Sequence, residues 1–318
     1  MSGKRVLVTG GSGFIPSHLV ERLMQDGCEV AVTVRYGNPI KNERLKSCWD
    51  DIFPIEADLR NRGALEKGLQ DFRPDTVYHL AAYNHVGQSF YQVEECFDVN
   101  AKGSANILDT CEMVGSVERF VYMSTSEVYG KQDSVPFEET MTPRPISPYA
   151  ITKYSGELYC RMKQQMSGNM SITIVRPFNV FGPYQSSKAV IPELILNCLN
   201  GNPVRTTKGE QTREFNYVDD IVAGLLLAGN IENSFDGPVN LAAAEEVSIR
   251  DLVLKIAELT GSSSKIEIGA IPYRPTEIWR MYADNTRAQE ILGWSPKVSL
   301  EDGLAKTIDW FRDYIALK

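Results

Sequence analysis

The sequence predicts an α/β protein with a doubly wound parallel sheet and a smaller, mixed α/β C-terminal lobe. Short apolar runs rich in β-branched residues alternate with longer helical patterns through the first half of the chain. Continuous apolar strands joined by helices are typical of a parallel sheet covered on both faces. The first run leads into the glycine-rich turn "GGSG" and then a helix. The second half is less regular, without an internal repeat or a low-complexity linker. We therefore expect two lobes, with the chain crossing between them more than once.

The elements follow one another in a regular order. The first strand, "RVLVTG" (5–10), is continuously apolar, and the helix "SHLVERLMQDG" (17–27) is amphipathic and closes at Gly27. Five further apolar runs predict strands, at 29–35, within 52–59, and at 75–82, 117–125 and 171–177. Helical patterns fill the gaps at about 61–71, 92–113 and 147–167. Later helices are expected at 189–200, 218–229, 248–260 and from about 299, with a strand near 215–218.

Composition excludes several classes of function. The 318 residues are 43% hydrophobic and 23% charged, with a net charge of −8 and no basic run, so a nucleic acid is not an expected partner. No apolar run approaches the ~20 residues of a membrane span and no secretion signal is present, so we expect a cytoplasmic protein without a membrane partner. The six cysteines are scattered and the three histidines lack metal-ligand spacing. Reduced thiols and no metal site are expected.

The glycine-rich turn predicts a dinucleotide site. Gly10 and Gly13 lie between a strand and a helix, where glycines let the backbone approach a pyrophosphate and the helix N-terminus supplies N–H groups. A tight strand–helix turn without a ligand is the alternative. Pro16 stands where a further glycine is expected. If Gly13 is the N-cap, Pro16 falls in the first turn and its missing N–H costs nothing. If Ser12 is the cap, proline deletes the first intrahelical bond and crowds the Ser12 carbonyl. We expect weakened cofactor binding, which Pro16→Gly should tighten.

The end of the second strand favours NADP, with NAD as the alternative. It reads Thr33-Val34-Arg35-Tyr36, with no acid until Glu43 to bind a ribose 2′-hydroxyl. Arg35 could instead pair with a 2′-phosphate, although it could also be a solvated strand-end arginine. Asp58 and Leu59 follow the third strand and are candidates for the adenine edge. An ordinary turn aspartate is the alternative for Asp58.

The segment "SPYAITKYSGELY" predicts an acid–base pair. Tyr149 and Lys153 are four residues apart on one helix and therefore share a face. A lysine ammonium beside a phenol lowers the phenol pKa, which makes Tyr149 a candidate general base or acid. At the end of the fifth strand, Thr125 could hydrogen-bond a substrate oxygen, and Ser126 with Glu127 would add a second acid–base pair. Ligands of such sheets bind at this carboxyl edge.

Taken together, these motifs resemble a known family. They are "VTGGSGFI", "HLAA" (79–82), "DVNAKGSANIL" (98–108), "STSEVYG" (124–130), "RPFNVFGP" (176–183), "QTREFNYVDD" (211–220) and "NTRAQEILGWSPK" (285–297), besides the Tyr149/Lys153 pair. The chain resembles extended short-chain dehydrogenases/reductases of the NAD-dependent epimerase/dehydratase family, which modify nucleotide-activated sugars. The resemblance runs nearly end to end and implies a Rossmann-type fold.

That resemblance implies a reaction. Tyr149 would remove a proton from a sugar hydroxyl, usually at C4, while hydride passes to the nicotinamide, and Lys153 would hold the nicotinamide ribose. The 4-keto sugar could then be re-reduced by a 4-epimerase, lose water across C5–C6 in a 4,6-dehydratase, or lose a carboxylate in a decarboxylase. The triplet Thr125-Ser126-Glu127 is similar to that of GDP-mannose-type 4,6-dehydratases, with Glu127 as the C5 base.

We therefore expect a 4,6-dehydratase that yields a 4-keto-6-deoxy sugar nucleotide, while several alternatives stay open. "STSEVYG" also resembles UDP-glucuronate decarboxylases, and "RPTE" (274–277) resembles reductases of 4-keto-6-deoxy sugar nucleotides. A 4-epimerase and a non-catalytic NADP-binding regulator are further alternatives. Glu127 could also be a structural carboxylate.

The resemblance also assigns binding residues, partners and domains. The cofactor would contact Gly10, Gly13, Phe14, Ile15, Arg35, Asp58, Leu59, Leu80, Ala81, Ala82, Tyr149 and Lys153. The nucleotide-diphosphate sugar would contact His85, Ser89, Asn179, Arg213 and Arg274, the two arginines clamping the diphosphate. A Rossmann domain would span 1–178 and about 214–242, and a nucleotide-sugar-binding domain about 179–213 and 243–318. A homodimer through the helices near 92–113 and 147–167 is implied.

Overall fold

Seven parallel strands form the central sheet of the computed structural model, which describes residues 2–35, 43–166, 170–230, 236–273 and 277–316. Their order is β11-β6-β5-β4-β1-β2-β3. The strands are β1 (Arg5–Thr9), β2 (Glu29–Val34), β3 (Phe53–Glu56), β4 (Thr76–His79), β5 (Arg119–Met123), β6 (Ser171–Pro177) and β11 (Pro238–Leu241). The strand order reverses between β1 and β4, which places a ligand crevice at their carboxyl ends. The predicted doubly wound α/β fold is confirmed.

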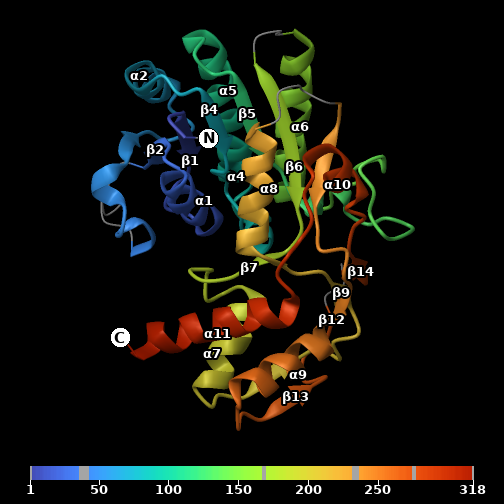
Figure 1. Ribbon diagram of the computed structural model, residues 1–318. Helices are drawn as coiled ribbons and strands as arrows, with labels where there is room; N and C mark the ends of the chain where they lie inside the picture. The colour runs from blue at the N-terminus through green and yellow to red at the C-terminus, as the bar shows by residue number, and fades with distance from the viewer. Residues whose placement is uncertain (1, 36–42, 167–169, 231–235, 274–276, 317–318) are drawn as a thin grey trace.

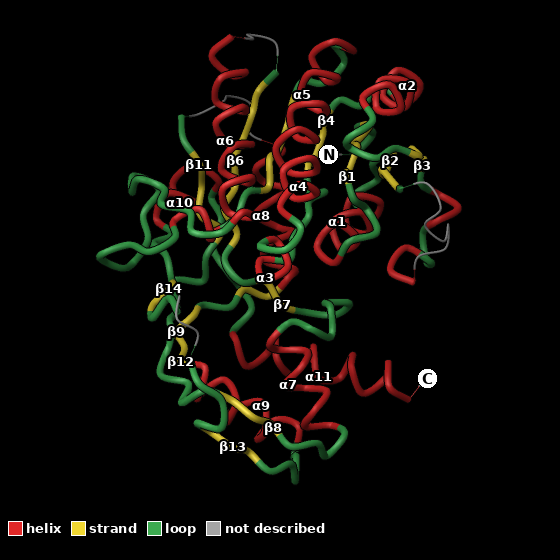
Figure 2. The backbone as a smooth tube through the Cα atoms, turned by 180° about the vertical axis from the view of Figure 1, so that it is seen from behind, coloured by secondary structure: helices red, strands yellow, loops and turns green. Residues whose placement is uncertain are grey.

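Helices cover both faces of this sheet (Figures 1 and 2). On one face lie α1 (Phe14–Gln25) and α8 (Val218–Asn230), and on the other lie α2 (Arg62–Phe72), α5 (Gly103–Val114) and α6 (Pro148–Met166). A separate apolar cluster fills the space under each layer. The six strands predicted in the first half are present; β6 has the predicted bounds, and the others are shorter than predicted. The seventh, β11, was not predicted, because four residues beginning with a proline give too short a pattern.

The predicted helix at 92–113 is continuous but contains a π-helical turn. It consists of α4 (Val93–Cys96), the π-helical segment η3 (Phe97–Lys102) and α5. Asn100 lies in the π-helical segment and is buried. Its side chain accepts from the backbone N–H of Tyr83 at 2.7 Å and donates to the Tyr83 carbonyl at 3.0 Å. The irregular turn thus fixes the loop that follows β4.

On each face of the sheet, a helix glycine packs against a buried tyrosine. A Cβ at Gly156 of α6 would overlap the hydroxyl of Tyr122 on β5, and a Cβ at Gly229 of α8 would overlap the hydroxyl of Tyr78 on β4. The Tyr122 hydroxyl donates to the carbonyl of Lys153 at 3.0 Å. The glycine at 156 therefore sets how closely the helix that carries Lys153 approaches the sheet.

A smaller part of the molecule lies beyond the end of the central sheet, below it in Figure 1. It contains α7 (Val190–Leu199), α9 (Ile249–Thr260), α11 (Leu300–Ala316) and the pair β8 (Val204–Thr206) and β13 (Ile266–Ile268). Between the two parts lie β7 (Val180–Phe181) with β10 (Asn216–Tyr217), and β9 (Thr212–Arg213) between β12 (Val247–Ser248) and β14 (Arg280–Met281). The short helix α10 (Thr286–Leu292) packs near β11. The chain passes repeatedly between these parts: α7, α9 and α11 lie in the smaller one, and α8 and α10 lie beside the central sheet.

The apolar core is not divided between the two parts. One cluster contains Val6 of β1, Ile221 of α8, Leu252 of α9 and Leu304 of α11. The boundaries predicted for two domains stay a prediction. Within the ranges given above, no helix has both the length and the apolar character needed to cross a membrane.

Candidate active site

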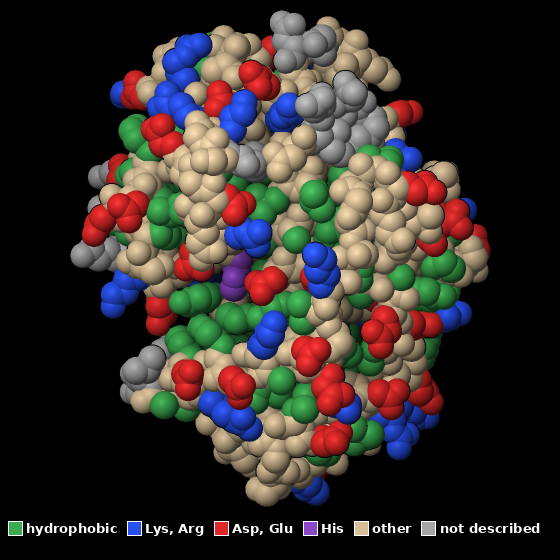
Figure 3. Space-filling model, viewed as in Figure 1, with side chains coloured by type: hydrophobic (Ala, Val, Ile, Leu, Met, Phe, Trp, Pro, Cys, Tyr) green, Lys and Arg blue, Asp and Glu red, His purple; other side chains and the backbone are tan. Residues whose placement is uncertain are grey.

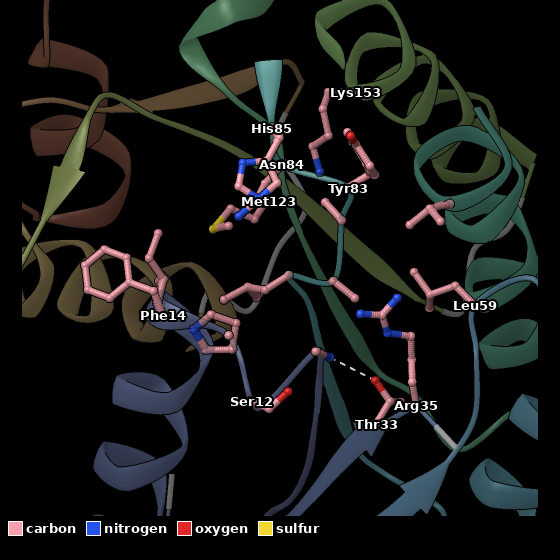
Figure 4. Close-up of a pocket in the computed structure, with 18 of the residues that line it drawn as sticks. Ser12, Phe14, Thr33, Arg35, Leu59, Tyr83, Asn84, His85, Met123 and Lys153 are labelled. Carbon is pink, nitrogen blue, oxygen red and sulfur yellow. Dashed lines mark hydrogen bonds between the residues drawn. The ribbon is translucent and has the colours of Figure 1, made fainter. Parts of the chain in front are cut away.

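The glycine-rich loop has the backbone geometry of an anion-binding turn. Gly10 has φ +70°, and a Cβ there would meet the Ala81 backbone at 2.9 Å. Its N–H donates to Thr33 Oγ1 at 2.8 Å (dashed in Figure 4). Gly13 is the N-cap of α1 and provides no side-chain cap. The first N–H groups of α1 therefore have no capping side chain as acceptor at Gly13, the arrangement that suits anion binding at a helix N-terminus.

Pro16 lies in the first turn of α1. With Gly13 as the N-cap, residue 16 is the third helical position, and the N–H of Ser17 makes the first intrahelical bond, to the Gly13 carbonyl, at 3.1 Å. This is the arrangement in which a proline costs the helix no bond of its own.

A cavity of about 480 Å³ opens beside this loop, a size typical of small-molecule sites. Its lining includes every predicted cofactor residue: Gly10, Gly13, Phe14, Ile15, Arg35, Asp58, Leu59, Leu80, Ala81, Ala82, Tyr149 and Lys153. Figure 4 shows Lys153 and His85 at one end of the cavity and Thr33 and Arg35 at the other. A nicotinamide dinucleotide fits this lining, because the glycine turn leaves room for a pyrophosphate between a candidate acid–base pair and a cation.

Asp58 has a partner of its own. Its carboxylate accepts from Arg60 Nε and Nη2, both at 2.8 Å. These hydrogen bonds hold the pKa of Asp58 below its ordinary value, and the charge of Arg35 contributes in the same direction. Contact between Asp58 and an adenine edge stays a prediction.

Tyr149 and Lys153 lie on one side of α6, as the spacing predicts, but their pKa values differ from expectation. Burial raises the pKa of Tyr149 to about 12, and a hydrogen bond with the Thr125 side chain opposes the rise. Burial lowers the pKa of Lys153 to about 8. Lys153 Nζ lies 4.5 Å from the ring centroid of Tyr122. The expected lowering of the Tyr149 pKa by Lys153 is therefore wrong for this arrangement, because desolvation dominates at both groups.

Thr125, Ser126 and Glu127 follow the end of β5, the latter two in a 3₁₀ turn, η4 (Ser126–Tyr129). Glu127 is half-buried, and burial raises its pKa while the charge of Arg213 lowers it. Its charge in turn raises the pKa of Tyr149, so the two side chains are close enough to interact. The Ser126 hydroxyl is instead directed at Met281 Sδ, 4.0 Å away.

A buried ion pair lies beneath these residues and was not predicted. Glu157 of α6 and Arg176 of β6 are fully buried and 2.7 Å apart. The hydroxyl of Ser124 also donates to Glu157, and Arg176 lies over the Tyr129 ring at 4.7 Å. The pair joins β5, β6, η4 and α6 where they carry the candidate catalytic groups. Its one sequence signal is Arg176, the single charged residue of β6, next to the end of the strand.

His79, at the end of β4, is a second buried polar group that was not predicted. Its Nδ1 lies 2.8 Å from Thr9 Oγ1 and its Nε2 lies 3.0 Å from Ser104 Oγ. Burial lowers the pKa of His79 to about 3, so the ring is neutral. The Thr9 hydroxyl also accepts from the backbone N–H groups of Leu80 and Ala81. This network fixes the part of the cavity wall, at Leu80 and Ala81, that packs beside Gly10.

The predicted substrate residues are placed differently from one another. His85 lines the cavity. Ser89 is fully buried, donates to the Val86 carbonyl at 2.6 Å and accepts from the N–H of Tyr149 at 3.2 Å. Ser89 therefore holds the first turn of α6 in position. Asn179 Nδ2 donates to the Glu214 carbonyl at 2.9 Å.

Of the two arginines predicted to bind the diphosphate, Arg213 lies within the described residues. Arg213 makes an ion pair with Glu277 at 2.7 Å and also donates to the Ile278 carbonyl. Arg274 lies outside the described residues.

Among the residues that the structure describes, no group of three or more His, Cys, Asp or Glu could hold a metal ion. All six cysteines are free thiols.

Comparison with known proteins gives consistent matches along the chain. A sequence model of the family described as GDP-mannose 4,6-dehydratase matches residues 7–307. The chain is 34% identical to a UDP-glucose 4-epimerase of Mycolicibacterium smegmatis, covering 97% of this chain and 99% of that protein. It is 31% identical to a dTDP-D-glucose 4,6-dehydratase of Bos taurus, covering 98% of this chain and 89% of the relative.

Solved structures agree with the fold. A UDP-glucose 4-epimerase of Thermotoga maritima, solved with UDP-glucose, has a TM-score of 0.91 at 33% identity and covers 98% of this chain and 99% of its own. A UDP-glucose 4-epimerase of Thermus thermophilus, solved in complex with NAD, has a TM-score of 0.87 at 32% identity and covers 97% and 99%. The cofactor named in this neighbour is NAD, which gives no support to the predicted preference for NADP.

Proposed function

The chain belongs to the GDP-mannose 4,6-dehydratase family and is an enzyme of the nucleotide-sugar dehydratase and epimerase type, and on that premise we propose that it is a nucleotide-sugar 4,6-dehydratase. The observation that supports this proposal is the environment of Glu127. Its carboxyl is half-buried, lies close enough to Tyr149 to interact with it, and has a pKa that burial raises. A base with a raised pKa binds a proton more strongly, as removal of the weakly acidic C5 proton requires. A simple 4-epimerase needs no such group.

In this reaction, different residues of the site would perform different steps. Tyr149 takes the proton of the C4 hydroxyl, with the Thr125 hydroxyl in hydrogen-bond contact to orient it. When bound, a nicotinamide cofactor supplies the hydride acceptor at C4 and later the hydride donor. Glu127 takes the C5 proton of the 4-keto sugar, and the C6 hydroxyl leaves as water once protonated. Ser126, the predicted acid partner, would have to turn away from Met281 to act here.

The second candidate is a 4-epimerase. It is favoured by the two solved epimerases, which cover nearly all of this chain at TM-scores of 0.91 and 0.87. In that case Glu127 would be a structural carboxylate near Arg213.

One experiment distinguishes the 4,6-dehydratase from the 4-epimerase. The wild type and Glu127→Gln are each incubated with a panel of UDP-, GDP-, CDP- and dTDP-sugars, and the products are analysed by mass spectrometry. We expect the wild type to produce a loss of water, about 18 mass units, from one sugar without added reductant. Glu127→Gln should reduce this at least about 100-fold, the lower end of the range for one general base, and let the 4-keto sugar accumulate. Glu138→Gln removes an exposed carboxylate from the same chain segment and should leave the rate unchanged.

Other products would contradict the proposal. A new isomer of unchanged mass, formed equally by wild type and Glu127→Gln, would establish the epimerase instead. Loss of carbon dioxide from a uronic-acid nucleotide would indicate a decarboxylase. Consumption of NADPH with a 4-keto sugar would indicate a reductase.

For the cofactor we propose a preference for NADP through Arg35. This side chain lies at the end of β2, lines the cavity and points into it (Figure 4). Arg35→Ser should weaken NADPH by roughly 10- to 100-fold, the equivalent of a hydrogen bond to a charged group, and change NADH by less than about twofold. Fluorescence titration with both nucleotides measures this, and Arg62→Ala, which removes an exposed arginine of α2, is the control. Wild-type protein that binds NADH more tightly than NADPH would contradict the preference.

We further propose that the part built from α7, α9 and α11 supplies the nucleotide-sugar site and that the enzyme is a homodimer. Arg213 of β9, between that part and the central sheet, supports the first proposal, since it lies near Glu127 and is already oriented by Glu277. Binding of a diphosphate there would require this ion pair to open. Exposed apolar side chains on α6 support the second.

A further inference from the structure

Glu214 is a fully buried carboxyl that takes no part in the proposed reaction. It lies between Arg213, the last residue of β9, and the strand β10, and it is 0% exposed. Burial raises its pKa to about 7. A buried carboxylate is costly unless hydrogen-bond donors surround it, so the fold has to supply N–H groups at this point.

The donors come from separate segments of the chain. Glu214 Oε2 accepts from the backbone N–H of Ala283, two residues after β14, at 2.7 Å. Oε1 accepts from the backbone N–H of Ala243, two residues after β11, at 2.6 Å and from Asn216 Nδ2 at 3.3 Å. The Asn216 amide also donates to the carbonyl of Phe178 at 3.1 Å. One carboxylate thus joins the segments that follow β6, β11 and β14.

The main chain of Glu214 belongs to the same network. Its carbonyl accepts from Asn179 Nδ2 at 2.9 Å, and the carbonyl of Asn179 accepts from the backbone N–H of Asn216 at 2.8 Å. Asn179 and Arg213 are two of the residues predicted to bind the nucleotide sugar. Glu214 is hydrogen-bonded to the first and is the sequence neighbour of the second. The network therefore holds the backbone from which both side chains extend.

The strands beside Glu214 offer few ladder hydrogen bonds of their own, because β9, β12 and β14 are each two residues long. They lie between the two parts of the molecule in Figure 1, and in Figure 3 apolar side chains form a band where these parts meet. Apolar contacts are non-directional, whereas hydrogen bonds to a carboxylate are directional. Glu214 therefore supplies a directional constraint on the alignment of β14 with β9, in which Met281 is opposite Arg213.

This alignment extends to the candidate catalytic groups. Met281 lies in one apolar cluster with Val128, which belongs to the same 3₁₀ turn as Glu127. Burial raises the pKa of Glu127, and the charge of Arg213 opposes the rise, so these two side chains interact across the site. A shift of β9 or β14 would move Arg213 relative to Glu127.

We propose that Glu214 is a positioning residue of the nucleotide-sugar site, which holds Arg213 and Asn179 in place by fastening the segments after β6, β11 and β14 to one another. The proposal rests on the proposed binding of the nucleotide sugar at Arg213 and not on which reaction follows. The cavity that we assign to the cofactor is lined by other residues. Loss of Glu214 should therefore weaken binding of the sugar nucleotide and not of the cofactor.

Replacement of Glu214 by glutamine tests this role. The amide keeps the size of the side chain but turns an NH₂ group toward a backbone N–H, so one of the joined segments loses its acceptor. At pH 8, above the pKa of Glu214, UDP, GDP, CDP and dTDP are titrated by calorimetry into the wild type and the variant. The tightest-binding of the four should bind the variant at least about tenfold more weakly, the equivalent of a hydrogen bond to a charged group. NADPH and NADH affinities, measured by fluorescence, should change by less than about twofold.

Two further variants distinguish positioning from loss of stability. Glu139→Gln also replaces a carboxyl that accepts from a backbone N–H, that of Asn240 at 2.8 Å. It should leave the affinity for the nucleoside diphosphate unchanged even where it lowers the thermal midpoint. Glu214→Asp keeps the charge but is one methylene shorter and cannot reach all three donors, so it should lose at least about threefold in affinity. This variant carries the test if Glu214→Gln does not fold.

Three results would overturn the proposal. A purely structural Glu214 would lower the thermal midpoint and leave the affinity for the nucleoside diphosphate within about twofold of the wild type. Equal losses of affinity for the nucleoside diphosphate and for NADPH would show a general loosening of the fold. A wild type that binds none of the four nucleoside diphosphates would have no such site for Glu214 to position.

The outcomes also distinguish this proposal from the proposed reaction. Selective weakening of nucleoside diphosphate binding by Glu214→Gln, in a protein that dehydrates no sugar, supports the positioning role and contradicts the 4,6-dehydratase alone. Unchanged binding by Glu214→Gln, in a protein that does dehydrate a nucleotide sugar, contradicts the positioning role alone.

Discussion

At the scale of single residues, the site contains groups held in states that water would not favour. Lys153 is 2% exposed, and burial lowers its pKa to about 8 from an ordinary 10.5. Glu157, one helical turn further on, works against this lowering. A buried ionisable group of this kind reduces stability, and such groups are common at functional sites.

Replacing Lys153 by methionine should therefore stabilise the protein while abolishing activity. The folded protein binds fewer protons than the unfolded chain between pH 8 and 10.5, so the stability of the wild type rises with pH through that window. At pH 7 the variant should gain up to about 3 kcal/mol, from 1.36 kcal/mol per pKa unit. Urea denaturation at pH 7 and near pH 10.5 measures the difference, which should shrink at the higher pH. A variant less stable than the wild type at pH 7 would contradict the assigned pKa.

The candidate catalytic and cofactor residues that line the cavity could be identified from the sequence because their spacing is local. Tyr149 and Lys153 are four residues apart, and the glycines lie within one turn. Their partners could not be predicted in the same way. Glu157 and Arg176, and His79 with Thr9, are joined only by folding, and neither pair has a pattern in the sequence. The pKa of Tyr149 was mispredicted for the same reason, since burial depends on distant chain segments.

At the scale of elements, the distance between α6 and the central sheet depends on a glycine, Gly156, which has no side chain. Gly156 lets Tyr122 of β5 fill the space beside the helix and bond the Lys153 carbonyl. The strands and helices of the first half could be predicted well from the sequence, because each is either a continuous apolar run or a long run with regular apolar spacing. It could not predict β11 or the π-helical segment at 97–102, since both depend on contacts with β6 and with the loop at Tyr83.

Substituting Gly156 by alanine should displace α6 and the groups that it carries. The added methyl overlaps a buried tyrosine, and overpacking of this kind typically costs about 1–3 kcal/mol. We expect that loss in urea denaturation together with a lower kcat, since Lys153 moves with the helix.

Gly63 of α2 provides the matched control. A Cβ there meets only Asn61 Oδ1, at 3.7 Å, so Gly63→Ala should be neutral or stabilise by about 0.5–1 kcal/mol. Equal stability changes at the two positions would show that α6 tolerates the added volume.

At the scale of the whole molecule, one helix face is left exposed and apolar. Ile151, Leu158, Met162 and Met166 lie along one side of α6 and are 40% to 75% exposed. Phe90, Tyr91, Val93 and Phe97 add exposed apolar area on the neighbouring segment. Contiguous exposed apolar surface marks an interaction site, and a second copy placed by a two-fold axis would cover it with the same surface.

The double substitution Leu158→Glu and Met162→Glu should therefore convert a dimer to a monomer. Two carboxylates on this face would have to be buried without partners in the dimer. Size-exclusion chromatography with light scattering gives the mass, expected to halve from twice 35.6 kDa. Leu254→Glu, at a 45% exposed leucine of α9, should leave the dimer intact. A wild-type protein that is already a monomer would rule the interface out.

The undivided apolar core has a consequence for how the protein is made. The cluster that includes Val6 of the first strand is completed by Ile308 and Phe311 of the last helix. During synthesis the ribosome releases the first strand long before the last helix. Until α11 emerges, the apolar surface that it will cover in this cluster has no native partner. The nascent chain therefore exposes this surface until α11 has emerged, and a product truncated before α11 would expose it in the cell.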